Sequence, residues 1–118
     1  MAYVNCGHIP PLLLRECGTV KRLDATATVV GLFGNWDCSV HEIQMQAGDV
    51  LSIVSDDVTE ATASNGDEFG ESRLLSVLRQ TRKLELDKIL QRIGQAVEEF
   101  RSGAYWQDDL TMVVARAQ

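Results

Sequence analysis

The sequence has 118 residues, of which 45% are hydrophobic and 24% are charged, and this composition is typical of one globular domain, 1–118, rather than of a disordered segment. The formal net charge is −6 without a basic stripe, which argues against a nucleic-acid-binding protein and against binding to an anionic membrane surface. No apolar run approaches the roughly 20 residues of a membrane span, and the first residues lack the pattern of a secretory signal, so we expect a cytoplasmic protein.

The first half of the sequence predicts β-structure, because short apolar runs alternate with turn residues. Pro10 and Pro11 separate the first two runs, since proline has no amide donor for a strand. The glycine-containing connection 46–49 predicts a hairpin between the last two runs. The predicted strands are residues 2–5, 12–15, 20–23, 28–33, 40–45 and 50–54.

The second half predicts helices and one last strand. Leu74, Leu75 and Leu78 lie on one face of a short helix. A longer amphipathic helix follows, with apolar residues at helical spacing from Leu86 to Phe100 and a stop near Gly103. Residues 110–115 then predict a strand that we place in the sheet of the first half. Many strands, two helices and a final strand predict the α+β class.

Two aspartate pairs flank predicted strands. Asp56 and Asp57 follow strand 50–54, and Asp108 and Asp109 precede strand 110–115. If these strands are antiparallel neighbours, four carboxylates meet at one edge of the sheet, where a hard divalent cation would relieve their repulsion. Taken alone, the spacing favours exposed turn or capping residues over a metal site, because aspartate is common at strand ends.

Cysteine and histidine residues suggest other sites. Cys6, His8, Cys38 and His41 could form a tetrahedral zinc site, although their spacing matches no standard zinc motif. Cys6 could act as a nucleophile beside His8, but no residue is placed to orient the histidine. With two histidines in the chain, a histidine-rich metal site of the kind found in small ligand-binding barrels is not expected.

Several segments, taken in order, resemble one protein family. They are YVNCGHIPPLLLR (3–15), VVGLF (29–33), AGDVLSIVSDDVTEA (47–61), GDEFGESRLLSVL (66–78) and QDDLTMVVAR (107–116). These segments are similar to the bacterial metal-dependent serine phosphatases of the stage II sporulation protein E type, within the type-two-C (PPM) superfamily. The habitual forms in that family are N-A-G-H, G-D-V-L-x-x-x-T-D-G-V-x-E-A and D-D-x-T, and their order covers nearly the whole chain.

The resemblance implies a fold and a reaction. The implied fold is an α/β/β/α sandwich of antiparallel sheets with flanking helices. The implied reaction is hydrolysis of phosphoserine or phosphothreonine on a phosphorylated regulatory protein, such as an anti-sigma-factor antagonist. Two Mn²⁺ or Mg²⁺ ions held by aspartates would activate a water for attack on phosphorus.

The resemblance also assigns residues to the metal site. Asp56 matches the aspartate of T-D-G, and Asp108 matches the first aspartate of D-D-x-T, so both are expected to be metal ligands. Asp109 takes the neighbouring position and is a further candidate ligand. Asp57 stands where the family has glycine, which permits unusual backbone angles, so its carboxylate either becomes an extra ligand or distorts the site.

Asn5, Gly7 and His8 match N-x-G-H, for which we expect a supporting role: a tight turn at Gly7 and a hydrogen-bonded His8 beside the site. The first aspartate of the family lies in an N-terminal half that this sequence does not match. We therefore expect the C-terminal part of a phosphatase domain, weakly active or inactive by itself, which self-associates through its exposed edge. The alternative is a non-catalytic pseudophosphatase module that binds a partner.

Overall fold

The computed structural model describes residues 1–26, 39–101 and 110–118. The predicted strand 28–33 and the candidate residues Cys38, Asp108 and Asp109 lie outside these ranges. The elements of the described residues are β1 (Ala2–Tyr3), β2 (Leu12–Leu14), β3 (Val20–Arg22), β4 (His41–Glu42), β5 (Val50–Val54), α1 (Asp56–Thr59), α2 (Gly70–Thr81), α3 (Leu86–Arg101) and β6 (Met112–Arg116).

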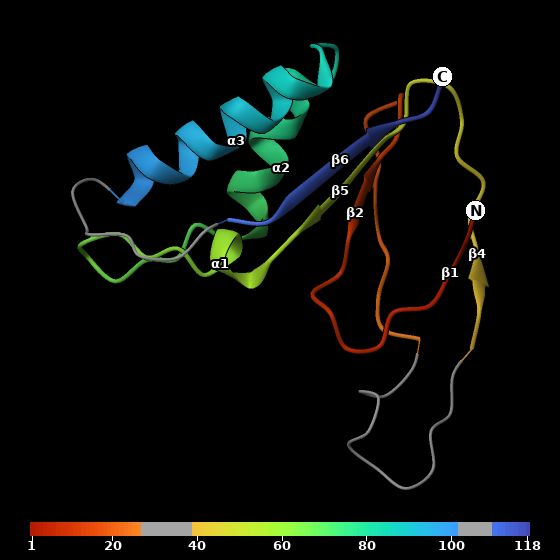
Figure 1. The fold of residues 1–118 in the computed structure, drawn as a ribbon, viewed down its shortest axis with the longest axis horizontal. Coiled ribbons are helices and arrows are strands. Elements are labelled where there is room, and N and C mark those ends of the chain that lie inside the picture. The colour runs from red at the N-terminus through yellow and green to blue at the C-terminus, as the bar shows by residue number, and fades with distance from the viewer. Residues whose placement is uncertain (27–38, 102–109) are drawn as a thin grey trace, which may run out of the picture. The chain divides into compact units, whose positions relative to one another are not determined.

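The described strands form two antiparallel sheets, which confirms the predicted α+β class. One sheet contains β1 and β4, and the other has the strand order β3-β2-β5-β6 (Figure 1). The chain divides into two compact units, one of residues 1–51 and 116–118 and one of residues 52–115. The prediction of a single domain over 1–118 stays a prediction.

The first unit has an apolar core built on the β2–β3 hairpin. Leu12 pairs with Arg22 and Leu14 with Val20, as the sequence predicted from the turn that follows residue 15. All three leucines of β2 are buried. Leu13, Leu23 and Ile43 form a buried cluster, against which half-buried Tyr3, Met45 and Leu51 pack, so both sheets contribute to this core.

The predicted hairpin between residues 40–45 and 50–54 is wrong. β4 pairs with β1 instead, with Tyr3 opposite His41, and β5 belongs to the other sheet. The connection turns sharply at Gly48, whose φ is +89° and whose amide donates to the Ala117 carbonyl at 2.9 Å. A positive φ favours glycine, and here it redirects the chain from one sheet to the other.

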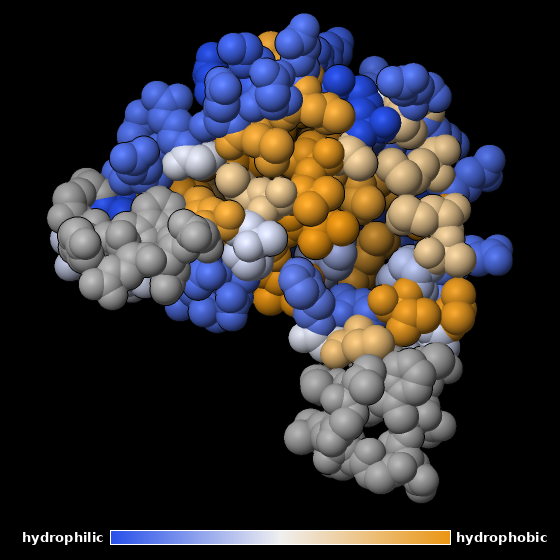
Figure 2. Space-filling model, viewed as in Figure 1, coloured by the Kyte–Doolittle hydropathy of each residue, from blue (hydrophilic) through white to orange (hydrophobic). Residues whose placement is uncertain are grey.

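The second unit contains the helices. α2 packs against α3, and the buried side chains of the two helices recur at helical spacing, as the sequence predicted. These side chains are Leu74, Leu78, Thr81, Ile89, Ile93 and Val97. Figure 2 shows hydrophilic atoms along the outer side of α3 and hydrophobic atoms over β5 and β6.

Aromatic contacts join the start of α2 to the end of α3. The Phe69 and Phe100 rings meet edge to face with centroids 5.6 Å apart, and the Arg73 guanidinium lies 4.5 Å from the Phe100 centroid. Arg73 also donates to the carbonyl oxygens of Glu68 and Phe69 at 2.7 and 3.1 Å. The loop that leads into α2 is therefore anchored at its end.

Within the described parts of the chain, none of the helices combines the length and the apolar character that crossing a membrane requires.

Candidate functional site

Asp56 and Asp57 form the first turn of the short helix α1, directly after β5. Val58 is fully buried and anchors this helix, whereas Asp56 is exposed and Asp57 is half-buried. Negative charge is favourable in the first turn of a helix because the unpaired amides there carry partial positive charge. The local sequence therefore places two acidic side chains at the end of a strand while one apolar residue holds them in position.

The replacement of the family glycine by Asp57 imposes no backbone strain. Asp57 is helical, so its backbone lies in a region that every L-residue adopts. The two expectations for the Asp57 carboxylate, an extra metal ligand or a distorted site, stay predictions. What the substitution adds is a second carboxylate next to Asp56.

The start of β6 lies beside the end of β5. The Ser55 amide donates to the Thr111 carbonyl at 2.9 Å, and the Thr111 amide donates to the Ser55 hydroxyl at 3.3 Å. At the other end of the pair, the Ala117 amide donates to the Asp49 carbonyl at 3.0 Å. The strands are therefore antiparallel neighbours, which was the condition for gathering both aspartate pairs at one edge. The metal-ligand role of these aspartates stays a prediction, because Asp108 and Asp109 lie outside the described residues.

The described residues supply only part of a metal site. Asp56 and Asp57 offer oxygen ligands of the type that Mg²⁺ and Mn²⁺ prefer. In the ranges 1–26, 39–101 and 110–118, however, no three histidine, cysteine, aspartate or glutamate side chains gather closely enough to hold a metal ion. A site for a divalent cation at the end of β5 therefore needs further ligands.

The described residues contain no cluster of cysteine and histidine side chains that could hold zinc. Cys6 and His41 belong to the first unit with His8, and Cys38 lies outside the described ranges. The Nδ1 atom of His8 lies 2.6 Å from the Ile9 carbonyl oxygen, which requires that this nitrogen carries the proton and donates. The His8 ring is thus bonded to the backbone.

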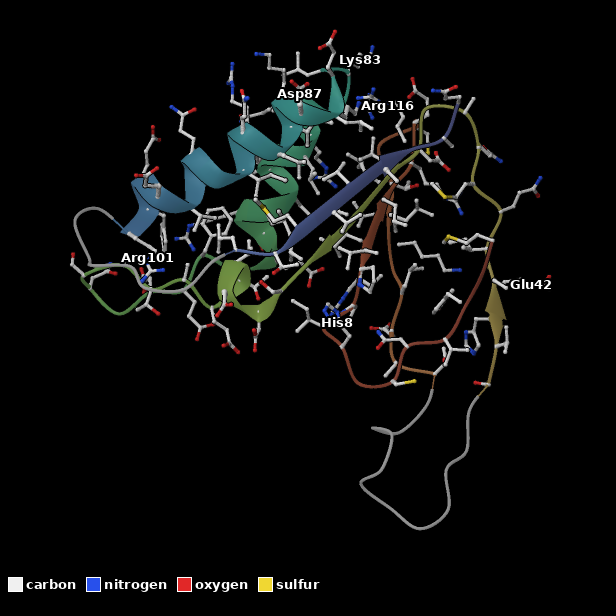
Figure 3. The ribbon with its side chains drawn as sticks, viewed as in Figure 1. His8, Glu42, Lys83, Asp87, Arg101 and Arg116 are labelled. Carbon is white, nitrogen blue, oxygen red and sulfur yellow. The ribbon has the colours of Figure 1, made fainter. Side chains whose placement is uncertain are left out.

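Asn5, Gly7 and His8 form a tight turn after β1, where Figure 3 shows His8 on the connection to β2. The buried Asn5 side-chain oxygen accepts from the Gly7 and His8 amides at 3.1 and 2.9 Å. Its amide group donates to the His8 and Leu23 carbonyls at 3.1 and 2.9 Å. Gly7 has φ +97°. This geometry is that of a structural turn, and its role in supporting a metal site stays a prediction.

Asp49 is a buried charged residue that the sequence analysis did not single out. Its carboxylate accepts from the Arg15 guanidinium at 2.7 Å, the Glu16 amide at 3.0 Å and the Gln46 amide at 2.9 Å. Burial alone would raise the pKa of Asp49, but these donors outweigh it and hold the pKa below its ordinary value. The signal that could have identified this residue is its position between Gly48 and an apolar strand, where a charged side chain needs partners.

Comparisons with known proteins agree with the fold and with the sequence motifs. The sequence model of the family described as stage II sporulation protein E (SpoIIE) matches residues 1–118. Among curated proteins, Protein IcfG of Synechocystis sp. (strain ATCC 27184 / PCC 6803 / Kazusa) is 29% identical over 113 residues, which are 96% of this chain and 18% of that protein. The chain thus spans less than a fifth of the length of this relative.

Solved structures show the same architecture over a longer chain. The SiaA-PP2C domain of Pseudomonas aeruginosa matches with a TM-score of 0.82 and 18% identity, covering 99% of this chain and 46% of that chain. The PP2C phosphatase domain of SpoIIE from Bacillus subtilis, solved with a fragment of its regulatory domain, matches with a TM-score of 0.73 and 25% identity, covering 98% of this chain and 33% of that chain. The described residues therefore have the fold of part of a PP2C phosphatase domain.

Proposed function

The chain belongs to the stage II sporulation protein E family, and from this premise we propose that it is part of a metal-dependent protein serine/threonine phosphatase. The observation that carries the proposal is the placement of Asp56 at the end of β5, beside the start of β6 at Thr111. In a metal-dependent phosphatase, this is a position from which carboxylates of two strands can reach one cation.

The reaction proposed for the complete domain is hydrolysis of a phosphoserine ester. A water oxygen bonds to phosphorus, the bond between phosphorus and the serine oxygen breaks, and that oxygen leaves with a proton. Divalent cations, when bound, lower the pKa of a water and neutralise charge on the phosphoryl group. Asp56, Asp108 and Asp109 would hold these cations as Mn²⁺ or Mg²⁺, and Asp57 would add negative charge beside them.

The proposed substrate is a phosphorylated regulatory protein, such as an anti-sigma-factor antagonist. Support comes from family membership and from the fold shared with the RsbU and RsbW domains of Rv1364c from Mycobacterium tuberculosis, at a TM-score of 0.66 and 16% identity. The chain spans 18% of its curated relative and 46% of the SiaA-PP2C domain, so the activity of a complete protein is part of the proposal.

A calorimetric titration with Mn²⁺ tests the proposal. We expect heat of binding from the 118-residue chain, and we expect Asp56→Asn to weaken that binding at least about tenfold, because it removes one charged ligand. Asp87→Asn is the matched control, because Asp87 also lies in the first turn of a helix of the second unit. Equal Mn²⁺ affinity in all three proteins would contradict the assigned ligand.

The alternative is a non-catalytic pseudophosphatase module, which Asp57 in place of the family glycine favours. The two functions differ in their response to metal. Mn²⁺-dependent release of phosphate from a phosphoserine peptide, lost in Asp56→Asn and kept in Asp87→Asn, supports the enzyme. If the chain shows no heat of Mn²⁺ binding and releases no phosphate from the peptide, the result supports the pseudophosphatase module.

A further inference from the structure

Ser55 lies where the strand β5 ends and the helix α1 begins (Figure 1), and its hydroxyl does not cap that helix. Its backbone is extended, with φ −73° and ψ 162°, as is usual for the residue before a helix. A serine at this position ordinarily accepts a hydrogen bond from an amide of the first helical turn. No such side-chain bond is made to α1, so the Ser55 hydroxyl has a different partner.

That partner is the amide of Thr111, the residue directly before β6. Two facing residues of an antiparallel pair ordinarily exchange two backbone hydrogen bonds, in which each amide donates to the carbonyl of the other residue. The first bond is present, because the Ser55 amide donates to the Thr111 carbonyl at 2.9 Å. In the second bond, the Thr111 amide donates to the Ser55 hydroxyl at 3.3 Å. The Ser55 side chain thus takes the place of its own carbonyl in the last hydrogen-bonded pair between the two strands.

The carbonyl of Ser55 takes part in the helix instead. It accepts from the Val58 amide at 3.1 Å, in the first turn of α1. Because the carbonyl is directed into the helix, the hydroxyl is the group of Ser55 that can accept from the neighbouring strand. Loss of the hydroxyl would remove this acceptor from the Thr111 amide, and the Ser55 amide alone would then hold this end of the pair.

The pair of Ser55 and Thr111 is close in the sequence to the candidate metal ligands. Asp56 follows Ser55 directly, and Asp108 and Asp109 precede Thr111 by three and two residues. In an antiparallel pair, the end of one strand and the start of the other lie at the same edge of the sheet. The two hydrogen bonds therefore fix the start of β6 relative to Asp56.

We propose that Ser55 is a positioning residue for the divalent-cation site at the end of β5. Its hydroxyl holds Asp56 in register with the segment that leads into β6, so that carboxylates from both segments can bind one cation. Ser55 does not itself bind the cation in this role. The proposal rests on the proposed function, because the cation is the Mn²⁺ or Mg²⁺ of that reaction. Groups that hold metal ligands in place commonly change metal affinity when they are removed.

Hydrogen exchange of the metal-free chain tests the structural step. Ser55→Ala removes the hydroxyl oxygen alone, whereas Ser55→Thr keeps it. The Thr111 amide should exchange about three- to tenfold faster in Ser55→Ala, because one hydrogen bond is lost, and at the wild-type rate in Ser55→Thr. Ser55→Cys, whose thiol is a weak acceptor, should give a rate between the two. An unchanged exchange rate in Ser55→Ala overturns the proposal.

Calorimetric titration with Mn²⁺ tests the positioning role, and circular dichroism establishes that each variant is folded. Ser55→Ala should bind Mn²⁺ about tenfold more weakly than wild type, whereas Ser55→Thr should bind as wild type does. Thr62→Val is the matched control, because it removes another hydroxyl close to α1 in the sequence, which donates to the Glu60 carbonyl at 2.9 Å. This control should leave Mn²⁺ affinity unchanged. Folded Ser55→Ala that binds Mn²⁺ as tightly as wild type overturns the proposal, even if it is less stable.

The outcomes separate this proposal from the proposed function. If Asp56→Asn weakens Mn²⁺ binding and Ser55→Ala does not, the metal site stands and the positioning role is wrong. If wild type releases no heat with Mn²⁺, the proposed function is contradicted and the positioning role is overturned with it, whatever the exchange rate of the Thr111 amide.

Discussion

The carboxylate of Asp49 receives hydrogen bonds from two separate turns of the chain. Arg15 and Glu16 follow β2, and Gln46 begins the turn that leads into β5. The side chain of Asp49 is 1% exposed, whereas that of Arg15 is 23% exposed. A buried carboxylate is stable only when its charge is paired and its lone pairs are satisfied, so Asp49 fastens the start of β5 to the end of β2.

This arrangement predicts a pH-dependent contribution to stability. The pKa of Asp49 is held below its ordinary value in the folded protein. A carboxyl whose pKa is lowered by folding stabilises the protein above its unfolded pKa of about 3.9 and loses this effect as pH falls further. Asp49→Asn should therefore lower the free energy of unfolding at pH 7 by about 1–3 kcal/mol, and the difference from wild type should shrink below about pH 4.

Urea unfolding at a series of pH values measures this difference. Asp24→Asn is the matched control, because Asp24 is also an aspartate of the first unit paired with an arginine, Arg22 at 4.0 Å, but its side chain is 74% exposed. Exposed ion pairs contribute little, so this variant should unfold like wild type at pH 7. An Asp49→Asn deficit that is constant across the pH range would contradict the lowered pKa.

At the scale of elements, local signals predicted the helices and failed for one strand connection. The apolar spacing from Leu86 to Phe100 predicted α3 nearly to its ends, because helical periodicity is visible within one segment. The connection 46–49 contains glycine and fits a hairpin or a corner equally well. The Asp49 carboxylate accepts hydrogen bonds from Arg15 and Glu16, which are more than 30 residues away in the sequence. These contacts favour the corner, and no local sequence pattern indicates them.

The candidate site, too, could be predicted only in part from the sequence. The order of residues along the chain was enough to place Asp56 directly after a buried strand. The two aspartate pairs can meet only if β5 and β6 are antiparallel neighbours, and the structure shows that they are. The short helix α1 was not predicted, because four residues show no period. Its presence explains why Asp57 fits without glycine. The buried Asp49 was missed because its partners are distant in sequence.

Two glycines of the helical unit allow a prediction about backbone conformation. Gly94 lies inside α3, and Gly70 is the first residue of α2 with φ +75°. An added Cβ meets no atom within 4 Å at either position, so space does not distinguish them. Alanine costs less backbone entropy than glycine in a helix interior, but it is strained at positive φ.

We therefore expect opposite signs for the two substitutions. Gly94→Ala should raise the free energy of unfolding by about 0.5–1 kcal/mol, and Gly70→Ala should lower it by about 1 kcal/mol. Thermal or urea unfolding measures both. A lower free energy of unfolding in Gly94→Ala would contradict the expected gain from alanine inside α3. An unchanged free energy of unfolding in Gly70→Ala would contradict the positive φ at the start of α2.

At the scale of the whole molecule, net charge opposes any association of identical chains. Each copy carries a formal net charge of −6, and like-charged proteins repel at low ionic strength. Salt should then act mainly on the repulsion, because it shortens the Debye length from about 10 Å at 0.1 M to about 3 Å at 1 M.

Any self-association of the chain should therefore rise with salt at fixed protein concentration. An interface formed by ion pairs would show the reverse, because salt screens attraction as well as repulsion. Sedimentation of wild type at about 0.05 M and about 0.5 M NaCl measures the sign of the effect.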